Sequence, residues 1–451
     1  MVLVEDASGF RGNADSLFAP ASEGELIDLL RTANRDGIPV TAVGSRTGVA
    51  GGCVPSEGWA ISLERFQTLD VHTGSALAGA GVALKEVQTA AAPSRQFYAP
   101  DPTEHTASVG GSIATNASGS RSFLYGDTRR HVLGLRVVLI DGTVLHLQRG
   151  EPVPFEVPDV PLPATTKFSA GFPLRPGMDY LDLFIGSEGT LGFVTEARLR
   201  LLPSPGELLS GVVFFSSDDT ALAAVETWRS VAGLRMLEYM DAGSLELLRP
   251  RFAELPAAAR AALLIEQEIA DTDAVDEWVD RLDASGAFAE ESWFGDSAAD
   301  RERFRVFRHA LPEAVNETVR RRGLTKMGTD FAVPLVRNAE MMAVYRETLQ
   351  REFPGQYVIF GHIGDAHVHA NILPRSEDES ARARVVITDL ARTAVAMGGT
   401  VAAEHGLGKR KAHLLGLQWP EQTVRAMAAV KRRLDPHWLL GRGNLFPSGV
   451  S

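Results

Sequence analysis

Three histidines, an aspartate and an asparagine gather in one short stretch of this 451-residue chain. The stretch reads Gly-His-Ile-Gly-Asp-Ala-His-Val-His-Ala-Asn over residues 361–371, and Glu404-His405-Gly406 follows downstream. Two imidazoles and one carboxylate form a donor set suited to Zn²⁺ or a similar divalent metal. A further histidine then remains to move a proton.

A hairpin would bring these side chains together. His362 and His369 are seven residues apart and would face opposite sides of one continuous strand. Gly364-Asp365 supplies a turn between them, and His367, His369 and Asn371 then share one face by a period of two.

Glu404 and His405 are adjacent, so their side chains diverge: one can bind a metal while the other faces a substrate. The competing interpretation is a set of buried histidines whose hydrogen bonds are satisfied by Asp365 and the backbone. The whole constellation favours the metal.

Three glycine-rich loops precede this cluster. Residues 44–52 have the chemistry of a phosphate cradle, but match neither a P-loop nor the G-x-G-x-x-G fingerprint. A structural turn explains that loop alone equally well. The runs at 108–119 and 186–192 add to it, and three such loops together favour a cofactor that carries phosphate.

Two cations are candidates for binding an anion. Arg308 lies on a helix that we expect to end at Pro312, and Lys326 precedes a predicted strand over residues 328–334. A guanidinium is a natural clamp for a substrate carboxylate.

Composition narrows the class of protein. A chain of this length predicts two or three domains, and the net charge of −12 argues against nucleic acid or an anionic membrane as a partner. The single cysteine, Cys53, excludes disulfides within the chain and cysteine-ligated clusters. Neither a signal peptide nor a stretch of about 20 apolar residues is found, so we expect a cytoplasmic protein.

The predicted elements divide the chain near residue 205. The first part is glycine-rich, with a helix over Leu26–Asn34 capped by Ser22 and a hairpin over 133–147. Beyond about 207, strands alternate with alanine-rich helices, which suggests a sheet covered by helices on one side. The expected helices there are 220–232, 273–284, 338–352 and 421–434.

Several motifs together resemble those of the vanillyl-alcohol-oxidase-type flavoproteins, specifically the FAD-linked D-2-hydroxyacid dehydrogenases. They are the three glycine loops, Pro100-Asp101-Pro102, Tyr125-Gly126, Gly361–Asn371, Glu404–Gly408 and Asn444–Pro447. The resemblance implies an α+β protein with a two-part FAD-binding domain (1–205), an α+β cap with a mainly antiparallel sheet covered by helices (206–435), and a tail (436–451) that returns to the FAD domain.

The resemblance also implies roles for particular residues. His362, His369 and Glu404 match the metal ligands, and His405 matches the base that takes the hydroxyl proton as hydride leaves for flavin N5. Arg308 and Lys326 match the carboxylate clamp, and Asn371 a substrate contact. Non-covalent FAD would be bound by Gly44, Ser45, Arg46, Thr47, Gly48, Gly51, Pro102, Gly110, Gly111, Thr115, Asn116, Gly119, Glu188, Gly192, Val194 and Asn444.

The chain departs from the common family form in ways that bear on substrate and metal. Ala366-His367 replaces the usual Gly-Asn, which makes His367 either a fourth ligand or a bystander. Pro312 stands where a small hydroxyl residue would contact a second carboxylate, which favours a monocarboxylate such as D-lactate over D-2-hydroxyglutarate. Glycolate is a further candidate.

Three functions compete. The first is an FAD- and metal-dependent D-2-hydroxyacid dehydrogenase that passes electrons to a quinone or an electron-transfer flavoprotein. The second is a flavin subunit that passes electrons to an iron–sulfur partner, since the cluster cannot lie on this chain. The third is a zinc hydrolase, which leaves the glycine loops unexplained. A homodimer is left open.

Overall fold

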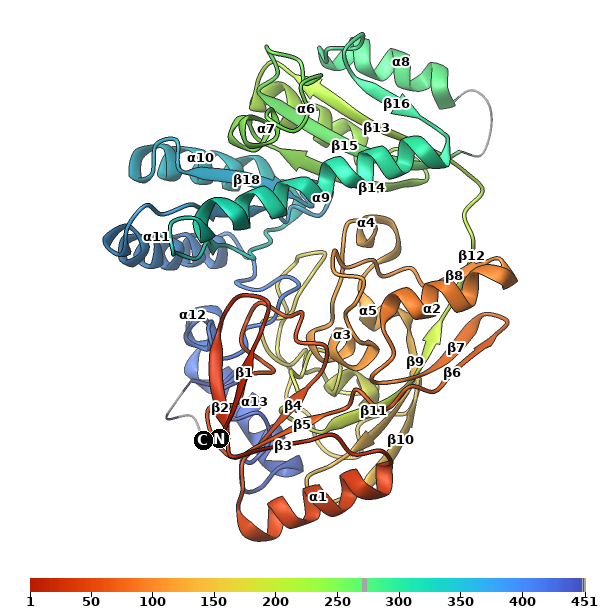
Figure 1. Ribbon diagram of the computed structural model, residues 1–451, viewed down its shortest axis with the longest axis vertical. Helices are drawn as coiled ribbons and strands as arrows, with labels where there is room; N and C mark the ends of the chain where they lie inside the picture. The colour runs from red at the N-terminus through yellow and green to blue at the C-terminus, as the bar shows by residue number, and fades with distance from the viewer. Residues whose placement is uncertain (270–273, 448, 450–451) are drawn as a thin grey trace.

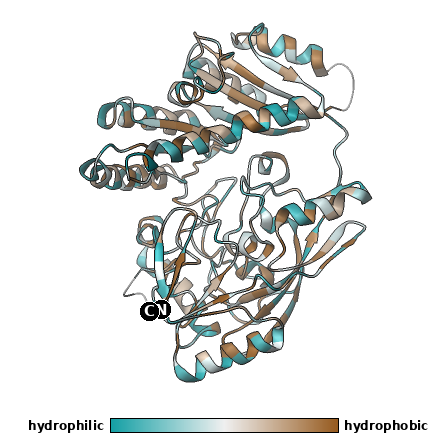
Figure 2. Cartoon of the chain, viewed as in Figure 1, coloured by the Kyte–Doolittle hydropathy of each residue, from teal (hydrophilic) through white to brown (hydrophobic). Residues whose placement is uncertain are grey.

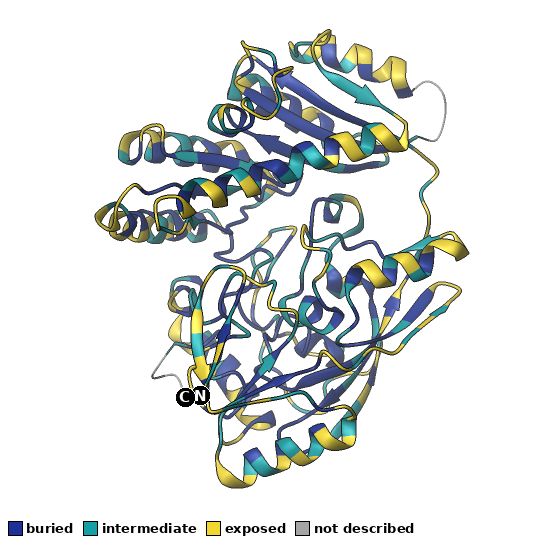
Figure 3. Ribbon diagram, in the orientation of Figure 1, coloured by how far each residue is buried: buried dark blue, intermediate teal, exposed yellow. Residues whose placement is uncertain are grey.

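The protein is described by a computed structural model that covers residues 1–269, 274–447 and 449. The N-terminal part, red to yellow in Figure 1, lies below a second part drawn in green to light blue. Brown, apolar residues concentrate on the strands and on one side of each large helix in Figure 2. Figure 3 shows that the central strands of the seven-stranded sheet are largely dark blue, and so buried.

Two sheets form the centre of the N-terminal part. A three-stranded parallel sheet has the order β3-β5-β4, and a five-stranded antiparallel sheet has the order β10-β9-β11-β7-β6. Their strands are β3 (Ser16–Phe18), β4 (Val40–Val43), β5 (Trp59–Ser62), β6 (Leu69–His72), β7 (Ser75–Gly79), β9 (Val132–Val138), β10 (Val144–Gln148) and β11 (Phe193–Arg200). The β9–β10 hairpin falls where the sequence predicts it.

Short elements surround these sheets. The helix predicted after Ser22 is α1 (Glu23–Asp36), and the Ser22 hydroxyl accepts the N–H of Glu25 at its start. The other elements are the β1 (Val2–Glu5) and β2 (Arg11–Ala14) hairpin, the β8 (Gln96–Phe97) and β12 (Leu202–Pro203) pair, α2 (Leu84–Ala91), α3 (Val109–Thr115), α4 (Ser122–Tyr125) and α5 (Thr128–His131).

A seven-stranded antiparallel sheet forms the second part, in the order β16-β13-β15-β14-β18-β19-β17. Its strands are β13 (Glu207–Phe215), β14 (Leu234–Met240), β15 (Ala261–Ile269), β16 (Trp293–Gly295), β17 (Met327–Gly328), β18 (Tyr357–Gly361) and β19 (His369–Ile372). Its helices are α6 (Asp218–Trp228), α7 (Ala242–Leu248), α8 (Ala274–Ser285), α9 (Ala298–Arg320), α10 (Asn338–Glu352) and α11 (Glu377–Ala396).

Helices cover both faces of this sheet, so the expectation of helices on one side is wrong. Alternate residues of β13 face opposite ways: Val213 and Phe215 join the core that contains α6, α8, α10 and α11. Val212 and Phe214 pack with α7 and α9 instead. The four consecutive apolar residues 212–215 of β13 alternate between the two faces, so both faces need cover.

Two local predictions also require correction. The helix expected to end at Pro312 continues through it to Arg320, because Leu311 and Val315 on either side of the proline are buried against the sheet. Packing there outweighs the backbone hydrogen bond that proline lacks. The strand expected over 328–334 is reduced to β17 and two isolated bridges at Ala332, to His367 and to Thr400.

After α11 the chain leaves the cap sheet and runs beside the N-terminal part. Figure 1 shows α12 (Leu415–Gln418) and α13 (Glu421–Leu434) there. Val40 of β4 forms a parallel bridge with Leu440. We retain domain boundaries at 205 and 435 as a proposal. No helix in the described residues is long and apolar enough to cross a membrane.

Candidate active site

A cavity of about 340 Å³ lies between the glycine-rich segments and reaches the histidine cluster. Its wall includes residues 42–50, at the end of β4 and in the first loop, most of α3, and the turn around Ser187-Glu188-Gly189. His362, Glu404 and His405 line the same cavity. One continuous space therefore joins the predicted cofactor loops to the predicted chemical groups.

Most residues predicted to contact a cofactor lie on this wall: Gly44, Ser45, Arg46, Thr47, Gly48, Pro102, Gly110, Gly111, Thr115, Gly119, Glu188, Gly192 and Val194. Glycine allows the close approach that a phosphate needs. A Cβ added at Gly48 would meet no protein atom within 4 Å. The open wall and the backbone N–H groups of these loops fit a large ligand that carries phosphate.

Three predicted cofactor residues do not line the cavity, and their contacts support the loops instead. Gly51 donates its N–H to Asp6. Asn116 adopts φ 51° after α3 and donates its side-chain amide to Asp127. Asn444 donates to the carbonyls of Gly52 and Glu188, which connects the end of the chain to two of the loops.

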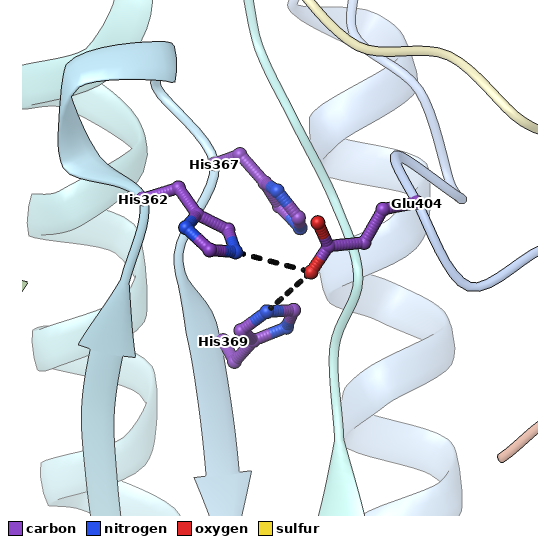
Figure 4. A group of neighbouring side chains, drawn as sticks. All are labelled: His362, His367, His369 and Glu404. Carbon is purple, nitrogen blue, oxygen red and sulfur yellow. Dashed lines mark hydrogen bonds and ion pairs between the residues drawn. The ribbon is translucent and has the colours of Figure 1, made fainter. Parts of the chain in front are cut away.

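The histidine cluster is formed by the β18–β19 hairpin and the segment after α11. One ligand atom from each of His362, His367, His369 and Glu404 can be chosen so that all four lie within 4.8 Å of one another. Figure 4 shows the four side chains converging. Glu404 Oε1 lies 3.1 Å from His362 Nε2 and 3.3 Å from His369 Nε2.

The outer nitrogens of two of these rings are fixed by acceptors. His362 Nδ1 lies 2.5 Å from Glu238 Oε1, and His369 Nδ1 donates to the carbonyl of Thr329 at 3.0 Å. Each ring therefore presents its Nε2 to Glu404. This arrangement of an acceptor behind a histidine is the usual support for a metal ligand.

The charges of the cluster favour a bound cation. Burial opposes charge on His362, but Glu238 and Glu404 raise the pKa of this ring to about 9. Burial likewise opposes charge on Glu404, yet His362 and Lys167 hold its pKa well below the usual range. The His362 ring thus carries a proton between the carboxylates of Glu238 and Glu404. A divalent metal would supply the positive charge in place of that proton. The donor set fits Zn²⁺ or a similar ion.

His367 differs from its neighbours. Its Nε2 lies 3.1 Å from Asp330 Oδ1, and its Nδ1 is buried with no hydrogen-bond partner among the described residues. Burial lowers the pKa of His367 to about 3, so the ring is neutral. A buried neutral imidazole with one unpaired nitrogen suits either a fourth ligand or a neighbour of the metal.

His405 is oriented by a fully buried carboxylate. Asp330 Oδ1 lies 3.4 Å from His405 Nδ1, and Asp330 Oδ2 accepts the backbone N–H of His405 at 3.0 Å. Desolvation lowers the pKa of His405 to about 4, although Asp330 and Glu404 oppose that shift. The ring is therefore neutral, and its Nε2, 3.6 Å from Glu404, is free to accept a proton.

The predicted substrate contacts lie off the cavity wall. Arg308 donates to Glu238 and Thr103, so it supports the carboxylate behind His362. Lys326 forms no ion pair with the described residues, and burial, with Lys411 nearby, lowers its pKa to about 8. Asn371 is buried and donates to the carbonyl of His369.

Four residues of the site were not assigned a role from the sequence: Ser118, Lys167, Glu238 and Asp330. Glu238 occupies a buried position of β14, and a lone carboxylate within such an apolar strand is a usable signal. Asp330 similarly interrupts an apolar segment. Ser118 and Lys167 lie in irregular segments, where no periodicity distinguishes them.

The fold and cavity together define a flavoprotein with an FAD-binding domain of the vanillyl-alcohol-oxidase type and a cap. Alkyldihydroxyacetonephosphate synthase has a similar fold, with a TM-score of 0.63 over 94% of this chain and 75% of that one, at 16% identity. Residues 14–148 match the FAD binding domain, and residues 205–445 match the C-terminal domain of FAD linked oxidases.

Curated proteins resemble the whole chain. The glycolate oxidase subunit GlcD of Bacillus subtilis is 28% identical over 97% of this chain and 90% of its own. D-2-hydroxyglutarate dehydrogenase of Xanthomonas citri pv. viticola is 31% identical over 96% of this chain and 89% of its own. D-lactate dehydrogenase of Archaeoglobus fulgidus is 30% identical over 94% of this chain and 90% of its own. The chain belongs to the FAD-linked oxidase family and is an FAD-dependent oxidoreductase.

Proposed function

We propose that the protein oxidises a D-2-hydroxyacid to the 2-oxoacid, with D-lactate the first candidate and glycolate and D-2-hydroxyglutarate the next. The observation that carries this proposal is the single cavity, because it joins the cofactor loops to His362, Glu404 and His405. Three relatives whose names specify glycolate, D-2-hydroxyglutarate and D-lactate support the substrate class.

His362, His369 and Glu404 would hold the metal, and the glycine loops would hold FAD without a covalent bond. When bound, FAD accepts a hydride and a divalent metal polarises a hydroxyl oxygen. His405 takes the hydroxyl proton at Nε2, since its Nδ1 faces Asp330. Arg308 and Lys326 are the proposed cations for the substrate carboxylate, and Asn371 a further polar contact.

The first experiment is anaerobic addition of D-lactate to the purified protein, before and after chelation. Bleaching of the flavin band near ~450 nm that chelation abolishes supports hydride transfer at a metal site. Flavin that is never reduced by any of the three hydroxyacids would overturn the proposed chemistry and leave the family assignment intact.

A second candidate concerns the electron acceptor. The name of the Bacillus subtilis relative specifies a subunit, which favours a flavin subunit that passes electrons to a partner chain such as an iron–sulfur protein. The alternatives are a quinone or an electron-transfer flavoprotein, and a homodimer stays open. Rapid flavin reduction without steady-state turnover would favour the partner chain. The cytoplasmic location stays a prediction.

A further inference from the structure

The two oxygens of Glu404 are held by different parts of the protein. Oε1 faces His362 and His369 of the cap. Oε2 accepts a hydrogen bond from the Ser118 hydroxyl at 2.7 Å and lies 3.4 Å from Lys167 Nζ. Both of these residues belong to the N-terminal part of the chain. The carboxylate therefore has one oxygen free to bind a metal, and the other fixes its orientation.

Lys167 is the more deeply buried of these two partners. Its side chain is 2% exposed and lies 3.4 Å from Asp365 Oδ2 and 3.3 Å from the carbonyl of Gly119. A buried ammonium requires such compensation by acidic and carbonyl oxygens. Lys167 thereby balances the charge of two carboxylates beside the cluster without occupying the face of Glu404 that meets the histidines.

Ser118 and Gly119 also form part of the cavity wall where FAD would lie. A Cβ at Gly119 would collide with the backbone carbonyl of Asp101, so this wall is tightly packed against its neighbour. The same two residues thus line the cofactor space on one side. On the other side, the Ser118 hydroxyl donates to Glu404, and the Gly119 carbonyl accepts from Lys167.

We propose that Ser118 and Lys167 are positioning residues for Glu404, and that through them FAD and a divalent metal increase each other's affinity. This inference rests on the assignment of Glu404 as a ligand under the proposed function. A cofactor against the wall orders the Ser118–Gly119 segment, which leaves Glu404 less freedom to lose when a metal binds. Because linkage is reciprocal, the same factor must apply in both directions.

The test measures Zn²⁺ affinity of the full chain by competition with a chelator, with and without bound FAD. We expect FAD to raise Zn²⁺ affinity about fivefold or more, and Zn²⁺ to raise FAD affinity by the same factor. Ser118→Ala and Lys167→Gln should both bring the ratio close to one. Ser210→Ala is the matched control, since Ser210 is buried and its hydroxyl has no partner among the described residues.

A ratio of one in the unaltered protein would overturn the proposal, as would a wild-type ratio in Ser118→Ala. Failure to bind Zn²⁺ in either state would overturn it as well. Ser118→Ala removes a single hydroxyl, so it remains informative if Lys167→Gln does not fold. The measurement needs no turnover, and so a protein that never oxidises a hydroxyacid would refute the proposed function while this coupling is still measured.

Discussion

Asp330 contacts both the ring and the backbone N–H of His405. Oδ1 lies 3.4 Å from Nδ1 of the imidazole, and Oδ2 accepts the backbone N–H at 3.0 Å. The carboxylate is fully buried, yet the histidines hold the pKa of Asp330 well below its usual range against the effect of burial. An ionised aspartate beside Nδ1 favours the tautomer that carries its proton on that nitrogen.

Replacing Asp330 by asparagine should therefore impair proton transfer more than binding. An amide can turn its NH₂ towards Nδ1, which favours the tautomer whose Nε2 already carries a proton. We expect the rate constant for anaerobic flavin reduction by D-lactate to fall about 100-fold or more. FAD and metal content should be unchanged. A rate within a factor of three of the unaltered protein would contradict the positioning role.

Gly48→Ala tests whether the cavity holds the cofactor. A Cβ at Gly48 would meet no protein atom within 4 Å, so the fold should tolerate it, but it would project from a cavity-lining residue. We expect FAD affinity to fall about tenfold, as for a lost or strained contact of about 1.4 kcal/mol, with an unchanged Tm of the FAD-free protein. Gly416→Ala, also free of contacts but outside the cavity wall, is the control. Equal FAD affinity in both variants would argue against the assignment.

Loss of a metal ligand should separate flavin binding from flavin reduction. His369→Ala removes an Nε2 that lies 3.3 Å from Glu404, and we expect Zn²⁺ affinity to fall by at least the 10–100-fold typical of weakened ligation. The flavin spectrum should remain, while reduction by D-lactate slows. Metal analysis and stopped-flow absorbance measure the two effects. His72→Ala, at an exposed position, is the control, and normal reduction by a metal-free His369→Ala protein would refute metal assistance.

Asp241 should make stability fall as pH rises. Burial raises the pKa of this carboxyl from 3.8 to about 7, although it accepts hydrogen bonds from Ser244 at the start of α7. The folded state therefore binds the proton more tightly than the unfolded chain, and the free energy of unfolding decreases with pH between about 4 and 7. The limiting slope for one proton is about 1.4 kcal/mol per pH unit.

Asp241→Asn should remove this contribution. We expect its Tm to rise relative to the unaltered protein as pH increases from 4 to 7, with the difference constant above that range. Calorimetry or circular dichroism at several pH values measures it. A Tm difference that does not vary with pH would show that Asp241 is ionised in the folded protein throughout.

Much of the site could be predicted because its residues are local in sequence. The turn at Gly364-Asp365 and the period of two along a strand were sufficient to bring His362 and His369 together, and β18 and β19 pair as that argument requires. The capped helix at Ser22 and the β9–β10 hairpin also follow from local rules. Such signals act over a few residues and need no knowledge of packing.

The features that the sequence did not predict depend on distant contacts. Pro312 does not end its helix, because the buried residues around it pack on a sheet whose strands are distant from it along the chain. The contact of Arg308 with Glu238 was not predicted because it joins residues 70 apart in sequence, and the role of Arg308 at the substrate carboxylate stays a proposal. The sequence around Lys167 does not indicate that this residue is buried. Its burial is favourable only because Glu404 and Asp365, which are distant in sequence, lie beside its ammonium group in the folded protein.

The hydrogen bond between Ser118 and Glu404 joins residues 286 positions apart. A ribosome must therefore add 286 residues after Ser118 before this contact can form, and the Val40–Leu440 bridge forms later still. During synthesis, an FAD domain that is made first would lack the proposed base and the proposed metal ligands. The nascent chain thus acquires Glu404 and His405 only after every strand of the seven-stranded sheet has been made.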